Sequence, residues 1–127
     1  MSFELDDSIR EDFLAEAGEI IEQLGEELVQ LEQRPTDADL LNSVFRGFHT
    51  VKGGAGFLNI TPLVDLCHAA EEAFDAMRNG QLELTTDIMD SVLQALDHVS
   101  SMLEVVAAGD HPEPAPADAA SARAGAP

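Results

Sequence analysis

Basic side chains are scarce in this sequence, and two kinds of aromatic side chain are missing from it. Its 127 residues include 6 Lys and Arg against 25 Asp and Glu, for a formal net charge of −19, and no Trp or Tyr. Proteins that bind nucleic acid need a basic surface to meet the phosphates, and many stack aromatic rings on the bases. The sequence therefore argues against nucleic acid as a partner, and its charge opposes adsorption to anionic lipid.

Long apolar runs and disulfide partners are absent as well. No segment approaches the roughly 18 consecutive apolar residues that a membrane-spanning helix needs. The first twelve residues, MSFELDDSIRED, carry acids where a signal peptide would be basic and then apolar. We therefore expect a cytoplasmic protein without membrane insertion. The single cysteine, Cys67, lies in an apolar helical context that predicts a small core residue rather than a reactive thiol.

Apolar residues recur at spacings of three and four in four segments, which predicts four amphipathic helices in one domain. The first helix is expected to start after Asp7 or Ser8 and to stop at Pro35, and the second to start near Thr36–Asp39 and to run to Leu58. The third should have Thr61 as its N-cap, with Pro62 at the first helical position, and end at Asn79–Gly80; the fourth should start around Thr86–Asp87 and end before Gly109. The first apolar stripe comprises Leu14, Ala17, Ile21, Leu24, Leu28 and Leu31; the second comprises Leu41, Val44, Phe48, Val51, Ala55 and Leu58. Short connections between such helices predict an all-α, antiparallel, up-down-up-down four-helix bundle over residues 1–109.

The sequence changes character from Asp110 onward. Pro112, Pro114 and Pro116 alternate with Ala, Glu and Asp, and the remainder is mostly Ala, Ser and Gly. Such a composition buries little apolar area and does not sustain a helix, so residues 110–127 are expected to form a disordered linker. Because a linker normally leads to another domain, we expect the chain to be part of a longer protein.

Three glycines, Gly53, Gly54 and Gly56, interrupt the second helical segment. They could end the helix, with glycine in the left-handed conformation, or they could lie inside it. The apolar stripe stays in phase from Val51 to Leu58, which favours a continuous helix. Each interior glycine then costs about 1 kcal/mol relative to alanine, but its bare backbone lets another surface approach closely.

His49 lies four residues before Gly53 and seven before Gly56, so the helical repeat puts all three on one side. Lys52 follows His49 by three positions. His49 is one position past the stripe residue Phe48, about 100° around the helix, near the edge of the buried face. The pattern predicts an exposed imidazole beside an ammonium group, with cleared backbone for a partner that must reach one atom.

The third segment offers the acidic candidates. His68, Glu71, Glu72 and Asp75 recur at three- and four-residue spacing, and a solvated face is the expected place for Glu72 and Asp75. Glu71 and His49 are each about ten residues from the turn between two antiparallel helices, so they could face one another. A carboxylate on one imidazole nitrogen would fix the tautomer and leave the other nitrogen as a nucleophile. Spacing alone leaves this pairing open.

Other chemistries find less support. The glycine-rich run lacks the Gly-Lys-Ser/Thr order of a phosphate-binding loop, and no serine or cysteine has a hydrolase context. His68-x-x-Glu71 resembles the spacing of di-iron carboxylate sites, but those use Glu-x-x-His in two copies, whereas this chain has one, reversed. We therefore expect no metal site. His98 and His111 are interpreted as incidental.

The segment 45–58, FRGFHTVKGGAGFL, resembles the phosphoacceptor segment of histidine phosphotransfer (HPt) domains. It is most similar to that of the N-terminal P1 domain of the chemotaxis histidine kinase CheA. The resemblance runs from residue 5 to residue 108 and includes His68, Glu71 and the segment Leu82–Asp87. It implies the helical bundle that the apolar spacing also predicts.

The resemblance also implies a function. His49 would accept the γ-phosphoryl group of ATP from a separate kinase domain and pass it to an aspartate of a response regulator. The supporting hydrogen-bond network would comprise Lys52, His68 and Glu71, and the surface for partner docking would comprise Phe45, Gly53, Gly54 and Gly56. The fragment would thus be a substrate and phosphocarrier, and its parent a histidine protein kinase.

Partners and cofactors follow from the same resemblance. The domain would bind no cofactor and no metal, since ATP and Mg²⁺ belong to the kinase catalytic domain and a further Mg²⁺ to the response regulator. The regulators would be CheY-like or CheB-like receiver domains, and the isolated bundle would be monomeric within a dimeric parent. Two alternatives are a stand-alone phosphorelay protein and a helical binding module without chemistry. Some family members have a fifth helix, and the proline-rich tail of this chain leaves open whether one is present here. The chain also has large Phe48 and Phe57 at two positions where the family often has smaller residues.

Overall fold

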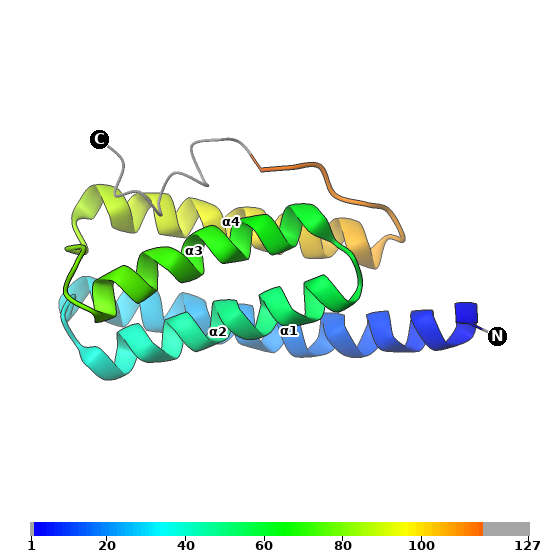
Figure 1. The fold of residues 1–127 in the computed structure, drawn as a ribbon, viewed down its shortest axis with the longest axis horizontal. Helices are drawn as coiled ribbons and strands as arrows, with labels where there is room; N and C mark the ends of the chain where they lie inside the picture. The colour runs from blue at the N-terminus through cyan, green and yellow to red at the C-terminus, as the bar shows by residue number, and fades with distance from the viewer. Residues whose placement is uncertain (1, 116–127) are drawn as a thin grey trace.

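The structure is a computed structural model that describes residues 2–115, with side chains from residue 7 onward. Within that range the chain forms four helices and no strand: α1 (Ser2–Gln33), α2 (Ala38–Phe57), α3 (Thr61–Arg78) and α4 (Thr86–Ala107). Figure 1 shows them side by side and alternating in direction, so the expected all-α, up-down-up-down bundle is confirmed. No fifth helix follows α4 among the described residues.

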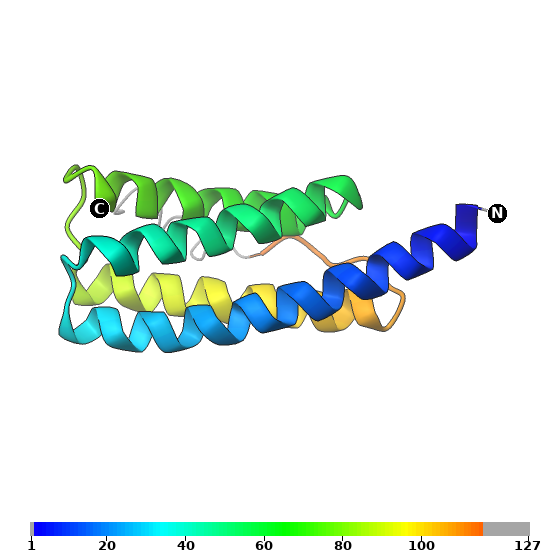
Figure 2. The same ribbon diagram turned by 90° about the horizontal axis from the view of Figure 1, so that it is seen from below.

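The helices form a closed ring of neighbours. Helix α2 packs against α1 and α3, and α4 packs against the same two helices from the other side. Figure 2 shows the N-terminal part of α1 extending beyond the ends of the other helices. The pair α2 and α3, which carries the candidate site, is a helical hairpin with a connection of three residues.

The helix starts agree with the sequence only in part. Helix α1 begins at Ser2, so the expected cap at Asp7 or Ser8 is wrong, and both residues lie inside the helix. Helix α3 has Ile60 as its N-cap rather than Thr61, and no side chain caps it. Helix α2 is capped by Asp37, whose carboxylate accepts a hydrogen bond of 3.1 Å from the backbone N–H of Leu40.

Three helices end in the same backbone motif. After α2, the N–H of Ile60 donates to the carbonyl of Ala55 at 2.9 Å, and the N–H of Asn59 donates to the carbonyl of Gly56 at 3.1 Å. This is the Schellman pattern, whose turn residue takes a positive φ: 60° at Asn59, 75° at Gly80 and 87° at Gly109. The tight turn at Asn59 reverses the chain at once and brings α3 back along α2.

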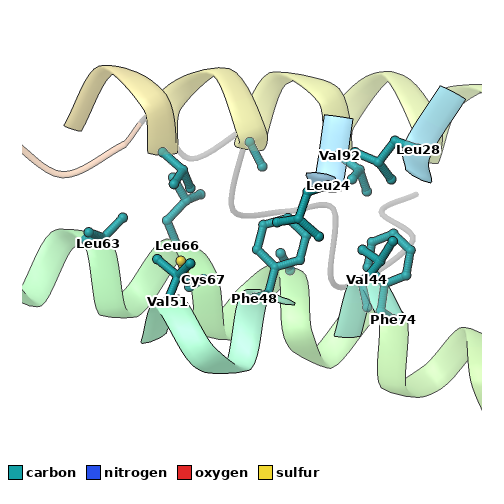
Figure 3. Close-up of a cluster of buried hydrophobic side chains, with 14 of the residues drawn as sticks. Leu24, Leu28, Val44, Phe48, Val51, Leu63, Leu66, Cys67, Phe74 and Val92 are labelled. Atoms are coloured by element: carbon teal, nitrogen blue, oxygen red, sulfur yellow. The ribbon is translucent and has the colours of Figure 1, made fainter. Parts of the chain in front are cut away.

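The core fills the space between the four helices. Figure 3 shows the side chains of α2 and α3 meeting those of α1 and α4, with Phe48 and Phe74 among the largest that are fully buried. Their rings stack with centroids 6.1 Å apart. The second stripe is buried as expected except for Leu58, which is half-buried. In the first stripe Leu14 and Ile21 are half-buried, and Phe13 is buried beside Leu14.

Cys67 is part of this core, as expected. Its side chain is completely buried in α3. Burial, together with the nearby charge of Glu71, raises the pKa of the thiol to about 12, although Lys52 acts in the opposite direction. The thiol therefore stays protonated at neutral pH, which agrees with a packing role.

Helix α2 continues through its glycines, so the continuous helix is confirmed over the helix-end interpretation. After α4, the described residues up to Ala115 are not helical, yet Pro112 is buried and Ala115 packs against the core. Residues 116–127 of the expected linker lie outside the described residues. No helix in the described range is long and apolar enough to cross a membrane.

Candidate functional site

His49 lies on the outer face of α2 and reaches toward α3. Its side chain is 63% exposed, and its Nδ1 is hydrogen-bonded to Oε2 of Glu71. The pairing that the sequence left open is therefore present. Because a carboxylate accepts, Nδ1–H is the donor, and Nε2 is the ring nitrogen that Glu71 does not hold. In the neutral tautomer that has this donor, Nε2 carries the lone pair.

Glu71 is the one charged residue among the described side chains that is buried, with 7% of its surface exposed. Its second oxygen, Oε1, accepts a hydrogen bond of 2.6 Å from Nζ of Lys52. Burial acts to raise the pKa of Glu71, but the hydrogen bonds and charges of Lys52 and His49 outweigh it and hold the pKa below its usual value. Glu71 is thus ionised and satisfied on both oxygens.

The helical hairpin explains why these three residues meet. His49 and Glu71 are ten and twelve residues from Asn59, which reverses the chain, and these nearly equal distances along two antiparallel helices bring their side chains level. Lys52 is one turn after His49 on the same face of α2. A charged group buried between two helices must have partners, and this register supplies two.

His68 departs from its expected place. It was expected to support Glu71 or Lys52, but its Nε2 lies 3.7 Å from Oε2 of Glu72, and it makes no hydrogen bond with either expected partner in the described structure. His68 and Glu72 are one turn apart on α3, and both side chains are substantially exposed. Glu71 is rotated away from them, into the interface with α2. His68 therefore borders the network without joining it.

The glycines divide into two groups. A methyl group built on Gly53 meets nothing within 4 Å, and one on Gly56 meets only Val64 at 3.9 Å, so both face open space. One built on Gly54 would lie 2.5 Å from Cδ1 of Phe13 on α1. Gly54 therefore serves the packing of α2 on α1, which corrects its assignment to the docking surface: that face is already covered.

Phe45, the fourth expected docking residue, is half-buried one turn before His49. Its ring is nearly parallel to the imidazole, with an interplanar angle of 10° and centroids 6.2 Å apart. The guanidinium of Arg78 lies over the same ring, 3.7 Å from its centroid. The sequence interpretation missed Arg78, although its position seven residues after Glu71 places it on the same face of α3.

The described side chains contain no group of three or more His, Cys, Asp or Glu residues arranged to hold a metal ion. The carboxylate of Glu71 is committed to Lys52 and His49, so its oxygens are not free to ligate. What the site offers is an exposed ring nitrogen, a buried carboxylate and an ammonium group. This set can present a neutral nucleophile and stabilise the charge that it gains on reaction.

The Hpt domain family model matches residues 8–108 of the chain. The sensor histidine kinase CheAY of Helicobacter pylori is 46% identical over 98 residues, which are 77% of this chain and 12% of that protein. The chemotaxis protein CheA of Bacillus subtilis is 38% identical over 97 residues, 76% of this chain and 14% of that protein. The chain thus spans about one-eighth of the length of these relatives.

Solved structures agree with the sequence relatives. The solution structure of the histidine phosphotransfer domain of CheA is similar with a TM-score of 0.80 and 30% identity, over 89% of this chain and 86% of that chain. The CheA phosphotransferase domain from Thermotoga maritima gives a TM-score of 0.74 and 32% identity, over 77% of this chain and 93% of that chain. With its four-helix fold and its exposed, carboxylate-bound histidine, the chain belongs to the Hpt domain family, as a homologue of the phosphotransfer domains of CheA.

Proposed function

We propose that this chain is the phosphoacceptor and phosphotransfer domain of a CheA-type histidine kinase. Nε2 of His49 accepts the γ-phosphoryl group of ATP from the kinase catalytic domain and passes it to an aspartate of a CheY-like or CheB-like receiver domain. The observation that carries the proposal is the exposed imidazole of His49 with its Nδ1 bound to Glu71.

The chemistry needs a neutral imidazole. In the first transfer the lone pair of Nε2 attacks the γ-phosphorus, the N–P bond forms, and the bond from phosphorus to the β,γ-bridging oxygen breaks as ADP leaves. The ring then carries positive charge, while the proton on Nδ1 stays in place. Glu71 stabilises that charge through the hydrogen bond that already exists, so little rearrangement is needed.

The second transfer reverses the charge change. A carboxylate oxygen of the receiver aspartate attacks phosphorus, the N–P bond breaks, and its electron pair returns to Nε2 to give the neutral ring. Lys52 donates to the second oxygen of Glu71 at 2.6 Å and so keeps the carboxylate ionised and in place as the acceptor of Nδ1–H. The same ammonium group adds positive charge beside the phosphoryl group, whose transfer depends on electrostatic stabilisation.

ATP and Mg²⁺ belong to the partners in this proposal, and the bundle supplies the histidine and its surroundings. Gly53 and Gly56 leave the backbone of α2 open beside His49, which supports close approach by two different partners in turn. We place the domain in the cytoplasm, within a longer dimeric kinase. The isolated bundle is monomeric, because its four apolar faces are buried against one another.

The test is phosphorylation of the chain by a CheA catalytic domain with radiolabelled ATP. Wild type should acquire an acid-labile, alkali-stable label, as expected of phosphohistidine. His49→Gln should lose the label and keep its helical content, while His111→Gln, which changes an exposed residue outside the helices, should be labelled like wild type. A label that persists in His49→Gln would refute the assignment, and an unlabelled wild type with an active kinase would favour a binding module.

A further inference from the structure

Arg78, the last residue of α3, is held by residues of two helices. Its Nε donates to Oδ1 of Asp75 at 2.9 Å, its Nη2 lies 2.9 Å from the same oxygen in an ion pair, and Nη1 donates to Oδ1 of Asn42 on α2 at 3.4 Å. The guanidinium also lies 3.7 Å from the centre of the Phe45 ring. The contact with Asp75 alone would make Arg78 part of an ordinary surface ion pair. The contacts with Asn42 and Phe45 also attach it to α2 beside the site.

The Phe45 ring links Arg78 to His49. Phe45 and His49 are one turn apart on α2, and their rings are nearly parallel at 10° with centroids 6.2 Å apart, a typical offset-stacked arrangement. A cation over an aromatic ring is attracted by its π-electrons, so Arg78 favours the position of the Phe45 ring that the structure shows. The three groups form a series from the end of α3 to the reactive imidazole.

This contact supplies a constraint that the carboxylate does not. The hydrogen bond to Glu71 restrains Nδ1 of His49, but one hydrogen bond on an exposed side chain still permits small coupled changes of χ1 and χ2. Such changes would tilt the ring and move Nε2 out of the position from which it attacks. A neighbouring ring held parallel to the imidazole opposes this tilt, so Phe45 complements Glu71.

We propose that Arg78 is a positioning residue for phosphoryl transfer: by holding Phe45 in place, it keeps the His49 ring in the plane needed for attack by Nε2. The proposal rests on His49 being the phosphoacceptor and deepens it by adding the Arg78–Phe45 pair. A simpler role for Arg78 is stabilisation of the C-terminus of α3, because a cation at a helix C-terminus is favourable. The experiment must therefore separate positioning from helix stability.

The first measurement compares Arg78→Met, Phe45→Leu and the double variant with wild type in phosphorylation by a CheA catalytic domain. Each single change should lower kcat about two- to five-fold, the factor that corresponds to one exposed cation–π contact, with KM for the chain unchanged. The double variant should be no slower than the slower single variant, because both changes remove one series of contacts. Multiplicative losses, or a change confined to KM, would overturn the proposal.

Two further variants control for the charge at the end of the helix. Arg34→Met removes an exposed arginine that pairs with Asp37 near the turn after α1, and it should leave kcat unchanged. Arg78→Lys keeps a positive charge at the end of α3 but loses the planar group that spans Asp75 and Phe45. Lysine should restore at most part of kcat; full recovery would show that charge alone matters and would overturn the proposal.

The second measurement does not depend on phosphorylation. Nitrogen-15 and proton NMR of the His49 ring reports its tautomer and its side-chain rotamers in the full chain. Arg78→Met should broaden the rotamer distribution and shift the signals of the ring protons, because the His49 ring stacks beside the Phe45 ring, while Arg34→Met should do neither. Unchanged His49 signals in Arg78→Met would overturn the positioning role even where wild type is phosphorylated. Failure of wild type to be phosphorylated would overturn the proposed function, and with it the role of Arg78 in transfer, whatever the NMR signals show.

Discussion

Lys52 of α2 and Glu71 of α3 are joined by a hydrogen bond of 2.6 Å, and the same carboxylate also accepts a hydrogen bond from His49. Glu71 is therefore shared between an ammonium group, which neutralises it, and an imidazole, which it orients. With only one of these partners, one oxygen of a carboxylate that is 7% exposed between two helices would be left without a hydrogen bond. Both partners are needed to keep the buried carboxylate charged and in position.

The network should make folding stability depend on pH in the acid range. The pKa of Glu71 in the folded chain is below its usual value of 4.5, because contacts with Lys52 and His49 outweigh the effect of burial. The contribution of its charge to stability is then fully present above that usual value and is lost as the pH falls through the lower, folded pKa. The free energy of unfolding in urea should show this loss in wild type and lack it in Glu71→Gln.

An exposed carboxylate on α4 provides the control for this pH dependence. Glu104→Gln removes an exposed carboxylate on α4, and the stability of this variant should follow that of wild type as the pH falls. If the difference in stability between wild type and Glu71→Gln stayed constant from neutral pH to about pH 3, the carboxylate would not be held in its charged form by the network.

Removing the carboxylate should also slow phosphorylation of His49. In Glu71→Ala the imidazole loses the acceptor that fixes its Nδ1–H, and the positive charge that forms during attack loses its counterpart. Hydrogen bonds to charged groups contribute about 1.5–3 kcal/mol, so the initial rate should fall roughly 10- to 100-fold. The rate is measured with radiolabelled ATP and a CheA catalytic domain. Under the same conditions His68→Ala should have a much smaller effect, since His68 contacts Glu72 and lies outside the network; comparable losses would contradict this division.

The sequence was sufficient to predict four helices and their order, and it made the meeting of His49 with Glu71 possible without deciding it. These features depend on apolar spacing and on a short connection, both of which are local. The start of α1 was not predicted: Asp and Ser are common N-cap residues, which favoured Asp7 or Ser8, but the helix begins at Ser2 and contains both. Similarly, Thr61 and Pro62 marked the start of α3 to within one residue.

The roles of Gly54 and His68 could not be predicted in the same way. Gly54 is in the same run as Gly53 and Gly56, and only the position of Phe13 on α1 shows that it faces inward. His68 shares a polar stripe with Glu71 and Glu72, and only the packing of α3 on α2 decides which carboxylate turns inward. Both depend on contacts between helices, which the spacing within one helix does not contain.

Gly54→Ala should destabilise the bundle, although alanine favours a helix. The new methyl group would lie 2.5 Å from Cδ1 and 2.7 Å from Cε1 of Phe13, so the buried Phe13 ring would have to move out of its packed position. Overpacking of this kind costs about 1–3 kcal/mol, more than the gain of about 1 kcal/mol in helix propensity. Urea unfolding should therefore show a lower midpoint than wild type. If Gly54→Ala were as stable as wild type or more stable, α1 and α2 would not be packed this closely at Phe13.

Gly53→Ala should separate stability from function. Nothing lies within 4 Å of the position that the methyl group would take, so the change should stabilise the helix by about 1 kcal/mol. The same methyl group would occupy the open side of α2 one turn after His49, where a partner must approach, so transfer to and from His49 should become slower. Gly18→Ala on α1 is the matched control, because it also faces open space but is far along the chain from the site; it should gain similar stability and transfer phosphate at the wild-type rate. Transfer by Gly53→Ala that equals or exceeds that of Gly18→Ala would show that the exposed glycine contributes nothing to docking.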